Sequence, residues 1–125
     1  QKDKEYYHQG IAYFKTGEFD QAEHVLGWIK KDFPIKSKLN YYKGMISWAL
    51  KKQDLGLKLF QQSIQEDREF YMPYISLAKA FQELNQPEKG LEILKDYMDK
   101  FPKSSHIIKI KQEYSKMLRD IKSRK

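Results

Sequence analysis

The chain repeats itself every 34 residues, and this period constrains its fold more than any other feature of the sequence. When the sequence is written in rows of 34 that start at Asp3, Ser37 and Tyr71, equivalent positions align without a gap. Row positions 8 and 20 hold small residues and row position 24 holds large apolar ones: Gly10, Gly44 and Ala78; Ala22, Gly56 and Gly90; Leu26, Phe60 and Leu94. A repeat of this length indicates one supersecondary unit that is stacked several times.

The residues between these positions favour helices throughout. Val occurs once, no Asn-Gly or Asp-Gly pair is present, and no segment alternates regularly between apolar and polar residues, so strand signals are almost absent. Thr16-Gly17-Glu18 and Asn85-Gln86-Pro87 interrupt the first and third rows at mid-unit, and Gln53-Asp54 must make the same turn in the second. The rows therefore predict seven antiparallel helices, over residues 3–16, 19–32, 37–51, 54–67, 71–84, 87–101 and 105–122.

The small positions explain how each hairpin would pack. A small residue at row position 8 that faces another at row position 20 lets two antiparallel helices approach closely, and bulky side chains then fill the flanks. After Ser104, apolar residues recur at helical spacing, as at Ile107, Ile110, Tyr114, Met117 and Ile121. We expect this last helix to cap the stack, with one face on the last hairpin and the other face polar.

The pattern resembles the tetratricopeptide repeat (TPR), a 34-residue helical hairpin with small residues at positions 8 and 20, a large apolar residue at 24 and Pro at 32. The third row fits best, with Tyr74, Leu77, Ala78, Phe81, Gly90, Leu94 and Pro102. The resemblance implies an all-α fold, a right-handed α-α superhelix (TPR solenoid) of seven antiparallel helices. It implies a single TPR domain over residues 1–125, with repeats at 3–36, 37–70 and 71–104 and a capping helix at 105–122.

The second row departs most from the family pattern. Asn40, Lys43 and Ser47 stand at row positions 4, 7 and 11, while Tyr41 and Trp48 stand beside the usual large positions. Two registers stay open for residues 38–50 on the sequence alone, the ideal one and one that is shifted by a single residue. In the shifted register Tyr41 and Trp48 belong to the core.

Enzymatic chemistry finds no support in the sequence. The chain has no Cys, and His8, His24 and His106 fall on three different predicted helices. No Gly-rich phosphate loop, nucleophile elbow or metalloprotease motif occurs, and acidic residues are scattered among lysines as on a solvated helix face. We predict a protein without catalytic residues, metal site or cofactor. No apolar run approaches the roughly 18 residues of a membrane span.

TPR domains serve as scaffolds that hold a peptide or helix in a concave groove lined by the first helix of each unit, and the resemblance implies this function here. In the ideal unit, row positions 2, 5, 9, 12 and 13 point into the groove. The predicted partner-binding groove comprises Tyr7, Ile11, Phe14, Tyr41, Met45, Trp48, Met72, Ile75 and Lys79. Because this lining is largely apolar, we expect another protein as the partner, bound through a helical or extended segment with apolar anchors.

The carboxylate clamp of the TPR cofactors of chaperones is not expected in this chain. That clamp needs Lys, Asn and Arg at fixed places in three successive units. This chain has at those places Tyr7, Ile11, Tyr42, Met72 and Ser76. Recognition of an acidic C-terminal tail by that mechanism is therefore excluded.

Three alternatives remain on the sequence alone: a small secretion-type chaperone, a self-associating (homo-oligomeric) assembly subunit, and a nucleic-acid-binding helical repeat. The net charge of +7 favours nucleic acid, but hydrophobic groove residues stand where base-reading polar ones would be needed, so that reading is disfavoured. From Lys103 onward eight basic residues face two acidic ones, which suits either a solubilising cap or a docking face for an anionic partner. The Phe33-Pro34 and Phe101-Pro102 endings resemble those frequent in TPR proteins of the bacterial cell envelope, and this resemblance slightly favours that location over the cytoplasm.

Overall fold

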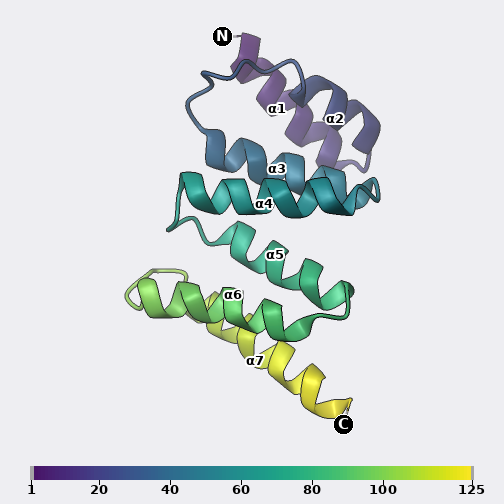
Figure 1. Ribbon diagram of the computed structural model, residues 1–125. Coiled ribbons are helices and arrows are strands. Elements are labelled where there is room, and N and C mark those ends of the chain that lie inside the picture. The colour runs from purple at the N-terminus through teal and green to yellow at the C-terminus, as the bar shows by residue number, and fades with distance from the viewer. Residues whose placement is uncertain (1, 125) are drawn as a thin grey trace. The chain divides into compact units, whose positions relative to one another are not determined.

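The structure of the chain is a computed structural model that describes residues 2–124, and these residues form seven α-helices and no β-strand. The helices are α1 (Lys2–Lys15), α2 (Phe19–Leu26), α3 (Lys36–Ala49), α4 (Gln53–Glu66), α5 (Met72–Glu83), α6 (Pro87–Lys100) and α7 (Ile107–Ser123). The predicted all-helical fold is confirmed. The described chain divides after Glu66 into two compact units, which we call unit 1 (α1 to α4) and unit 2 (α5 to α7; Figure 1). The single continuous domain stays a prediction.

One predicted helix is much shorter than expected. Six of the seven helices begin and end within two residues of their predicted bounds, but α2 ends at Leu26 rather than at residue 32. Gly27 follows as its C-cap, and the next amides bond three residues back, from Trp28 N–H to the Val25 carbonyl at 3.1 Å. Glycine costs a helix about 1 kcal/mol relative to alanine, which favours an end here. The remaining residues 27–35 form a non-helical segment that we call the α2–α3 segment.

The small row positions lie opposite each other, as predicted. A β-carbon added to Gly56 would lie 3.3 Å from the carbonyl oxygen of Gly44, and one added to Gly90 would lie 2.8 Å from that of Ala78. The Phe60 ring covers Gly44, at 2.7 Å from a β-carbon built there. Each hairpin therefore depends on a missing side chain for the close contact of its two helices. The contact also shows that α3 keeps the ideal register and is not shifted by one residue.

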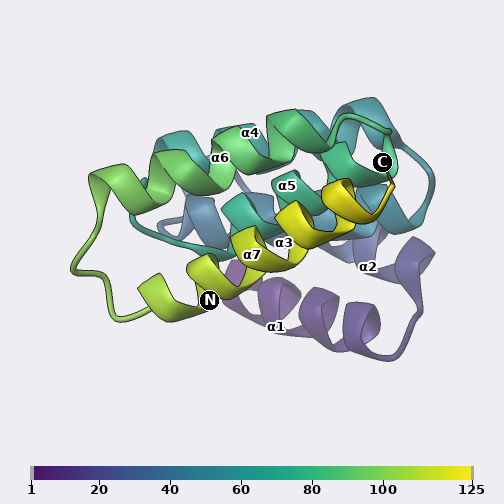
Figure 2. The same cartoon turned by 90° about the horizontal axis from the view of Figure 1, so that it is seen from below.

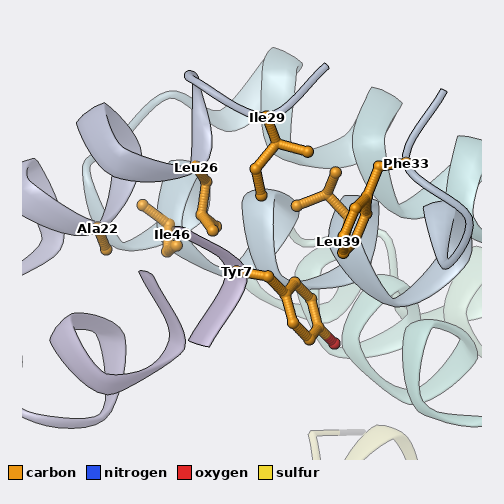
Figure 3. Close-up of a cluster of buried hydrophobic side chains, with 7 residues drawn as sticks. All are labelled: Tyr7, Ala22, Leu26, Ile29, Phe33, Leu39 and Ile46. Atoms are coloured by element: carbon orange, nitrogen blue, oxygen red, sulfur yellow. The ribbon is translucent and has the colours of Figure 1, made fainter. Parts of the chain in front are cut away.

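The core of unit 1 is built by α1, α2, the α2–α3 segment and α3 together. Figure 3 shows seven converging side chains: Tyr7, Ala22, Leu26, Ile29, Phe33, Leu39 and Ile46. Leu26 and Ala22 are fully buried, and Phe33 is buried although it lies outside any helix. The short α2 thus still delivers its apolar residues to the core, because the segment that follows it folds back onto α1 and α3.

A polar contact joins α3 to α4 inside unit 1. Ser37 and Ser63 are both buried, and each hydroxyl donates to the other residue's carbonyl oxygen, at 2.8 Å for Ser37 Oγ and 2.6 Å for Ser63 Oγ. The two hydroxyl oxygens lie 3.1 Å apart. Both buried hydroxyl groups are thereby satisfied within the protein.

Unit 2 consists of the α5–α6 hairpin and α7. The Tyr74 and Tyr97 rings meet edge to face with centroids 4.9 Å apart, and their hydroxyls donate to the carbonyl oxygens of Arg68 and Glu69. Helix α7 runs beside the hairpin (Figure 2) and buries Ile110 and Met117 against it. The predicted cap is therefore present within unit 2. Its outer face is polar apart from Ile108.

Candidate functional site

The predicted groove residues are divided between the two units. Tyr7, Ile11, Phe14, Tyr41, Met45 and Trp48 lie in unit 1, and Met72, Ile75 and Lys79 lie in unit 2. Lys79 is exposed, Tyr7 and Tyr41 are buried, and the remaining six are half-buried. Several of these side chains already contact neighbours in the folded chain, so the surface they offer is smaller than row positions alone suggest.

An aromatic row connects α1 to α3 in unit 1. Tyr42 lies at its centre, with ring centroids 6.1 Å from both Tyr7 and Phe14 and 5.1 Å from Tyr41. Phe14 also meets Phe19 at 5.9 Å. Tyr42 is not among the predicted groove residues, because its row position does not face an ideal groove. The one sequence feature that could have indicated its role is that it directly follows Tyr41, a predicted groove residue.

A hollow of about 500 Å³ opens beside the first half of α1, and we call it the α1 hollow. Its walls come from α1 and from the end of the α2–α3 segment: Asp3, Lys4, Tyr7, His8, Asp32, Phe33, Pro34 and Ile35. The Asp3 carboxylate accepts the backbone N–H of Lys30 at 3.3 Å, which ties the segment to α1. Two of the predicted groove positions of the first row, Lys4 and Tyr7, thus line a real concavity.

The chemistry of the α1 hollow is mainly apolar with a few hydrogen-bond donors. Phe33, Pro34 and Ile35 supply the apolar wall, and the Ile35 side chain is 43% exposed. The Tyr7 hydroxyl points away from the core cluster (Figure 3), and burial raises the pKa of Tyr7 to about 12. The phenol therefore stays protonated at neutral pH and remains a hydrogen-bond donor. Such a site suits an apolar side chain of a peptide whose backbone carbonyl groups need hydrogen-bond donors.

Unit 2 has a hollow of about 380 Å³ between α5 and α7, and its character is different. Charged residues dominate, and they already pair with each other. The Glu113 carboxylate forms ion pairs with the Lys109 ammonium group at 3.2 Å and with the Lys79 ammonium group at 3.9 Å. The Gln82 side-chain amide donates a hydrogen bond to the Asp120 carboxylate at 3.2 Å. Lys79, the last predicted groove residue, therefore lies in a polar and internally neutralised environment.

Metal-binding and membrane-spanning features are absent from the described part of the chain. Among residues 2–124, no group of three or more His, Asp or Glu side chains is placed to hold a metal ion. Within the same residues no helix combines the length and the apolar character needed to cross a bilayer.

A comparison with known protein families identifies the third repeat. The sequence profile of the tetratricopeptide repeat family matches residues 76–104, which is most of the third row. A search among curated proteins found no sequence match.

Solved structures resemble the whole chain. The TPR2B domain of yeast Sti1 in its pHsp70 complex has a TM-score of 0.79 at 20% identity, and the likeness covers 95% of this chain and 98% of that one. The Yersinia enterocolitica type III secretion chaperone SycD, in complex with a peptide of the translocator YopD, has a TM-score of 0.82 at 14% identity, over 97% and 92%. The first TPR domain of Spaghetti (RPAP3), bound to the HSP90 peptide SRMEEVD, has 0.77 at 18%, over 97% and 96%.

These findings agree with the packing of the chain itself. Gly44 faces Gly56 and Ala78 faces Gly90, which is the arrangement that the repeat pattern required. The profile match makes residues 76–104 a tetratricopeptide repeat, and the likeness to TPR domains along nearly the whole chain shows that the chain has the all-α TPR solenoid fold.

Proposed function

We propose that this protein is a non-enzymatic interaction scaffold that binds a helical or extended segment of another protein through apolar anchor residues. The observation that carries the proposal is the α1 hollow, with its exposed Ile35 and its apolar wall. Its support from outside the chain is that Sti1, RPAP3 and SycD, which share the fold, were each solved with a bound peptide or Hsp70.

Within unit 1, the bound segment would follow α1 and α3 and contact the half-buried Ile11, Phe14, Met45 and Trp48. Met72, Ile75 and Lys79 of unit 2 stay predicted groove residues. Tyr7 and Tyr41 would support this surface from below, since both are buried. The α1 hollow would receive one large apolar side chain of the segment.

The mode of binding would differ from that of an acidic chaperone tail. The clamp positions hold Tyr7, Ile11, Tyr42, Met72 and Ser76, and none of these side chains carries a positive charge at neutral pH. Recognition would instead depend on desolvated apolar contacts, of which a few typically supply most of the binding energy. In the α1 hollow, the Lys4, His8 and Tyr7 donors would bind carbonyl oxygens of the partner's backbone.

A matched pair of variants tests this proposal. Peptides are first selected from a displayed library on the purified protein, and the affinity of the tightest one is measured by fluorescence anisotropy. Ile35 and Leu55 are equally exposed, at 43%, but only Ile35 lines the α1 hollow. We expect Ile35→Ser to weaken binding by about tenfold or more and Leu55→Ser to leave it unchanged. Equal effects of both changes, or selected peptides without apolar residues, would contradict the proposal.

A secretion-type chaperone or self-associating subunit is the second candidate, and the likeness to SycD favours it. SycD has also been solved as what is described as an alternative dimer, with the same TM-score of 0.82. Light scattering over a wide dilution series separates the candidates. A mass near twice 15.1 kDa would support self-association, and a constant 15.1 kDa would eliminate it.

A further inference from the structure

Unit 1 contains a second hollow, of about 560 Å³, that lies between the α2–α3 segment, α3 and α4. We call it the lysine hollow, because four lysines line it: Lys30 and Lys31 from the segment, and Lys36 and Lys43 from α3. It shares only Phe33 with the α1 hollow. The proposed peptide-binding function does not use it.

Lysines outnumber carboxylates by four to one in the wall of the lysine hollow. Glu66 is the one carboxylate in its wall, and its Oε1 already accepts a hydrogen bond of 2.7 Å from the Asn40 side chain. None of the four lysines belongs to the ion pairs found among residues 2–124. The lysines that do form such pairs are Lys52, Lys79, Lys95, Lys100 and Lys109.

Lys43 is the most unusual member of this group. It stands at row position 7, where the equivalent residue of the third repeat is Leu77, which is 1% exposed. Lys43 is itself half-buried, and burial lowers the pKa of its ammonium group. Keeping such a cation in a partly desolvated place costs free energy that a bound anion would recover.

The α2–α3 segment separates charges of opposite sign. Its own carboxylate, Asp32, lines the α1 hollow together with Asp3, whereas Lys30 and Lys31 line the lysine hollow. The base of the lysine hollow includes the buried side chains of Ile29 and Leu39. Apolar residues beside several lysines lower the local dielectric constant and strengthen the attraction for a compact anion.

We propose that the lysine hollow binds a phosphate group, either of a small phosphorylated molecule or of a phosphorylated side chain of a partner protein. Four ammonium groups against one engaged carboxylate match an anion that carries two or more charges. Lysines act as mobile point charges and suit a tetrahedral phosphate, and no arginine is present to hold a planar carboxylate in two parallel hydrogen bonds. Asn40, Gln62 and Gln65 add amide donors for the phosphate oxygens.

The test is a titration with inorganic pyrophosphate at constant ionic strength, followed by heteronuclear NMR and by thermal unfolding. The hollow variant is Lys36→Gln with Lys43→Gln, and the matched control is Lys111→Gln with Lys122→Gln. The control pair lies on α7 in unit 2 and removes the same charge from exposed lysines that form no ion pair with another of residues 2–124. We expect saturable binding to the wild type with shifts around Lys43, weakened about tenfold or more in the hollow variant and unchanged in the control.

Two further measurements identify the source of the phosphate and check that the variant is folded. The single change Lys36→Gln affects an exposed side chain at the start of α3, and its affinity loss is measured beside an unchanged far-ultraviolet circular dichroism spectrum. Tighter binding of a phosphoserine peptide than of pyrophosphate assigns the phosphate to a partner protein, and the reverse order assigns it to a small molecule. The proposal is overturned by absence of saturation, by equal loss in both double variants, or by equal affinity for a glutamate peptide.

Discussion

The packing of Phe60 over Gly44 allows a quantitative prediction, because the third repeat solves the same problem with different residues. A β-carbon at Gly44 would lie 2.7 Å from two ring carbons of Phe60, far inside normal contact distance. In the third repeat the equivalent positions are Ala78 and Leu94, and both are fully buried. In the third repeat a methyl group at row position 8 thus coexists with leucine at row position 24, whereas in the first repeat a β-carbon at Gly10 would overlap the Leu26 side chain.

The expected free energies of unfolding follow from this geometry. Gly44→Ala alone gains about 1 kcal/mol of helix propensity but pays about 1 to 3 kcal/mol for overpacking, so we expect a net loss of up to about 2 kcal/mol. Phe60→Leu alone loses about 1 to 2 kcal/mol by leaving a cavity. In the Phe60→Leu background, Gly44→Ala should stabilise, because a leucine that packs as Leu94 does beside Ala78 removes the overlap and the propensity gain remains. The coupling energy between the two sites should therefore be about 1 to 3 kcal/mol and favourable.

Urea unfolding followed by tryptophan fluorescence measures this cycle. Both tryptophans, Trp28 and Trp48, lie in unit 1, so their emission reports on the unit that carries the changes. Additivity of the two changes to within about 0.5 kcal/mol would refute the reasoning. It would mean that the α3–α4 hairpin relaxes around an added methyl group without resistance from the Phe60 ring.

Two further predictions concern polar groups in the core. Ser63→Ala removes the donor to the buried Ser37 carbonyl oxygen and should cost about 1 to 3 kcal/mol in urea unfolding, whereas a loss below about 0.5 kcal/mol would show that water replaces it. Burial raises the pKa of Tyr74 to about 12 from its ordinary 10.0, so its share of the stability is complete below pH 10 and falls as pH rises towards 12. Tyr74→Phe should therefore flatten the alkaline decline of the unfolding free energy, and parallel declines in both proteins would contradict this account.

The sequence predicted the fold well because the fold depends on a few steric contacts. Small residues at row positions 8 and 20 are required wherever two helix backbones nearly touch, so Gly56 and Gly90 identified the hairpins directly. The end of α2 was mispredicted, because Ile29 and Phe33 have helical spacing to Leu26 and reach the core as they would from a helix. The hydrophobic period records which residues are buried, and it does not record the backbone path that brings them there.

The candidate sites were less predictable than the fold. Lys4 and Tyr7, at row positions 2 and 5, line the α1 hollow, but its other wall is the α2–α3 segment, for which a helix was expected. The lysine hollow was missed for the same reason. On a continued α2 the consecutive Lys30 and Lys31 would have looked like ordinary solvated residues, and only their position beside Lys43 gives them a shared environment.

Different residues in and beside the α2–α3 segment line different hollows, and this has an evolutionary consequence. Neighbouring residues serve different concavities: Ile35 belongs to the α1 hollow, and Lys36, the first residue of α3, belongs to the lysine hollow. Mutation at either residue changes one surface and spares the other, so selection can tune the two independently. Phe33 contributes to both walls and to the core, and a change there is felt in three places at once. Among related chains, Phe33 should therefore vary least, while Ile35 and Lys36 should vary without correlation to each other.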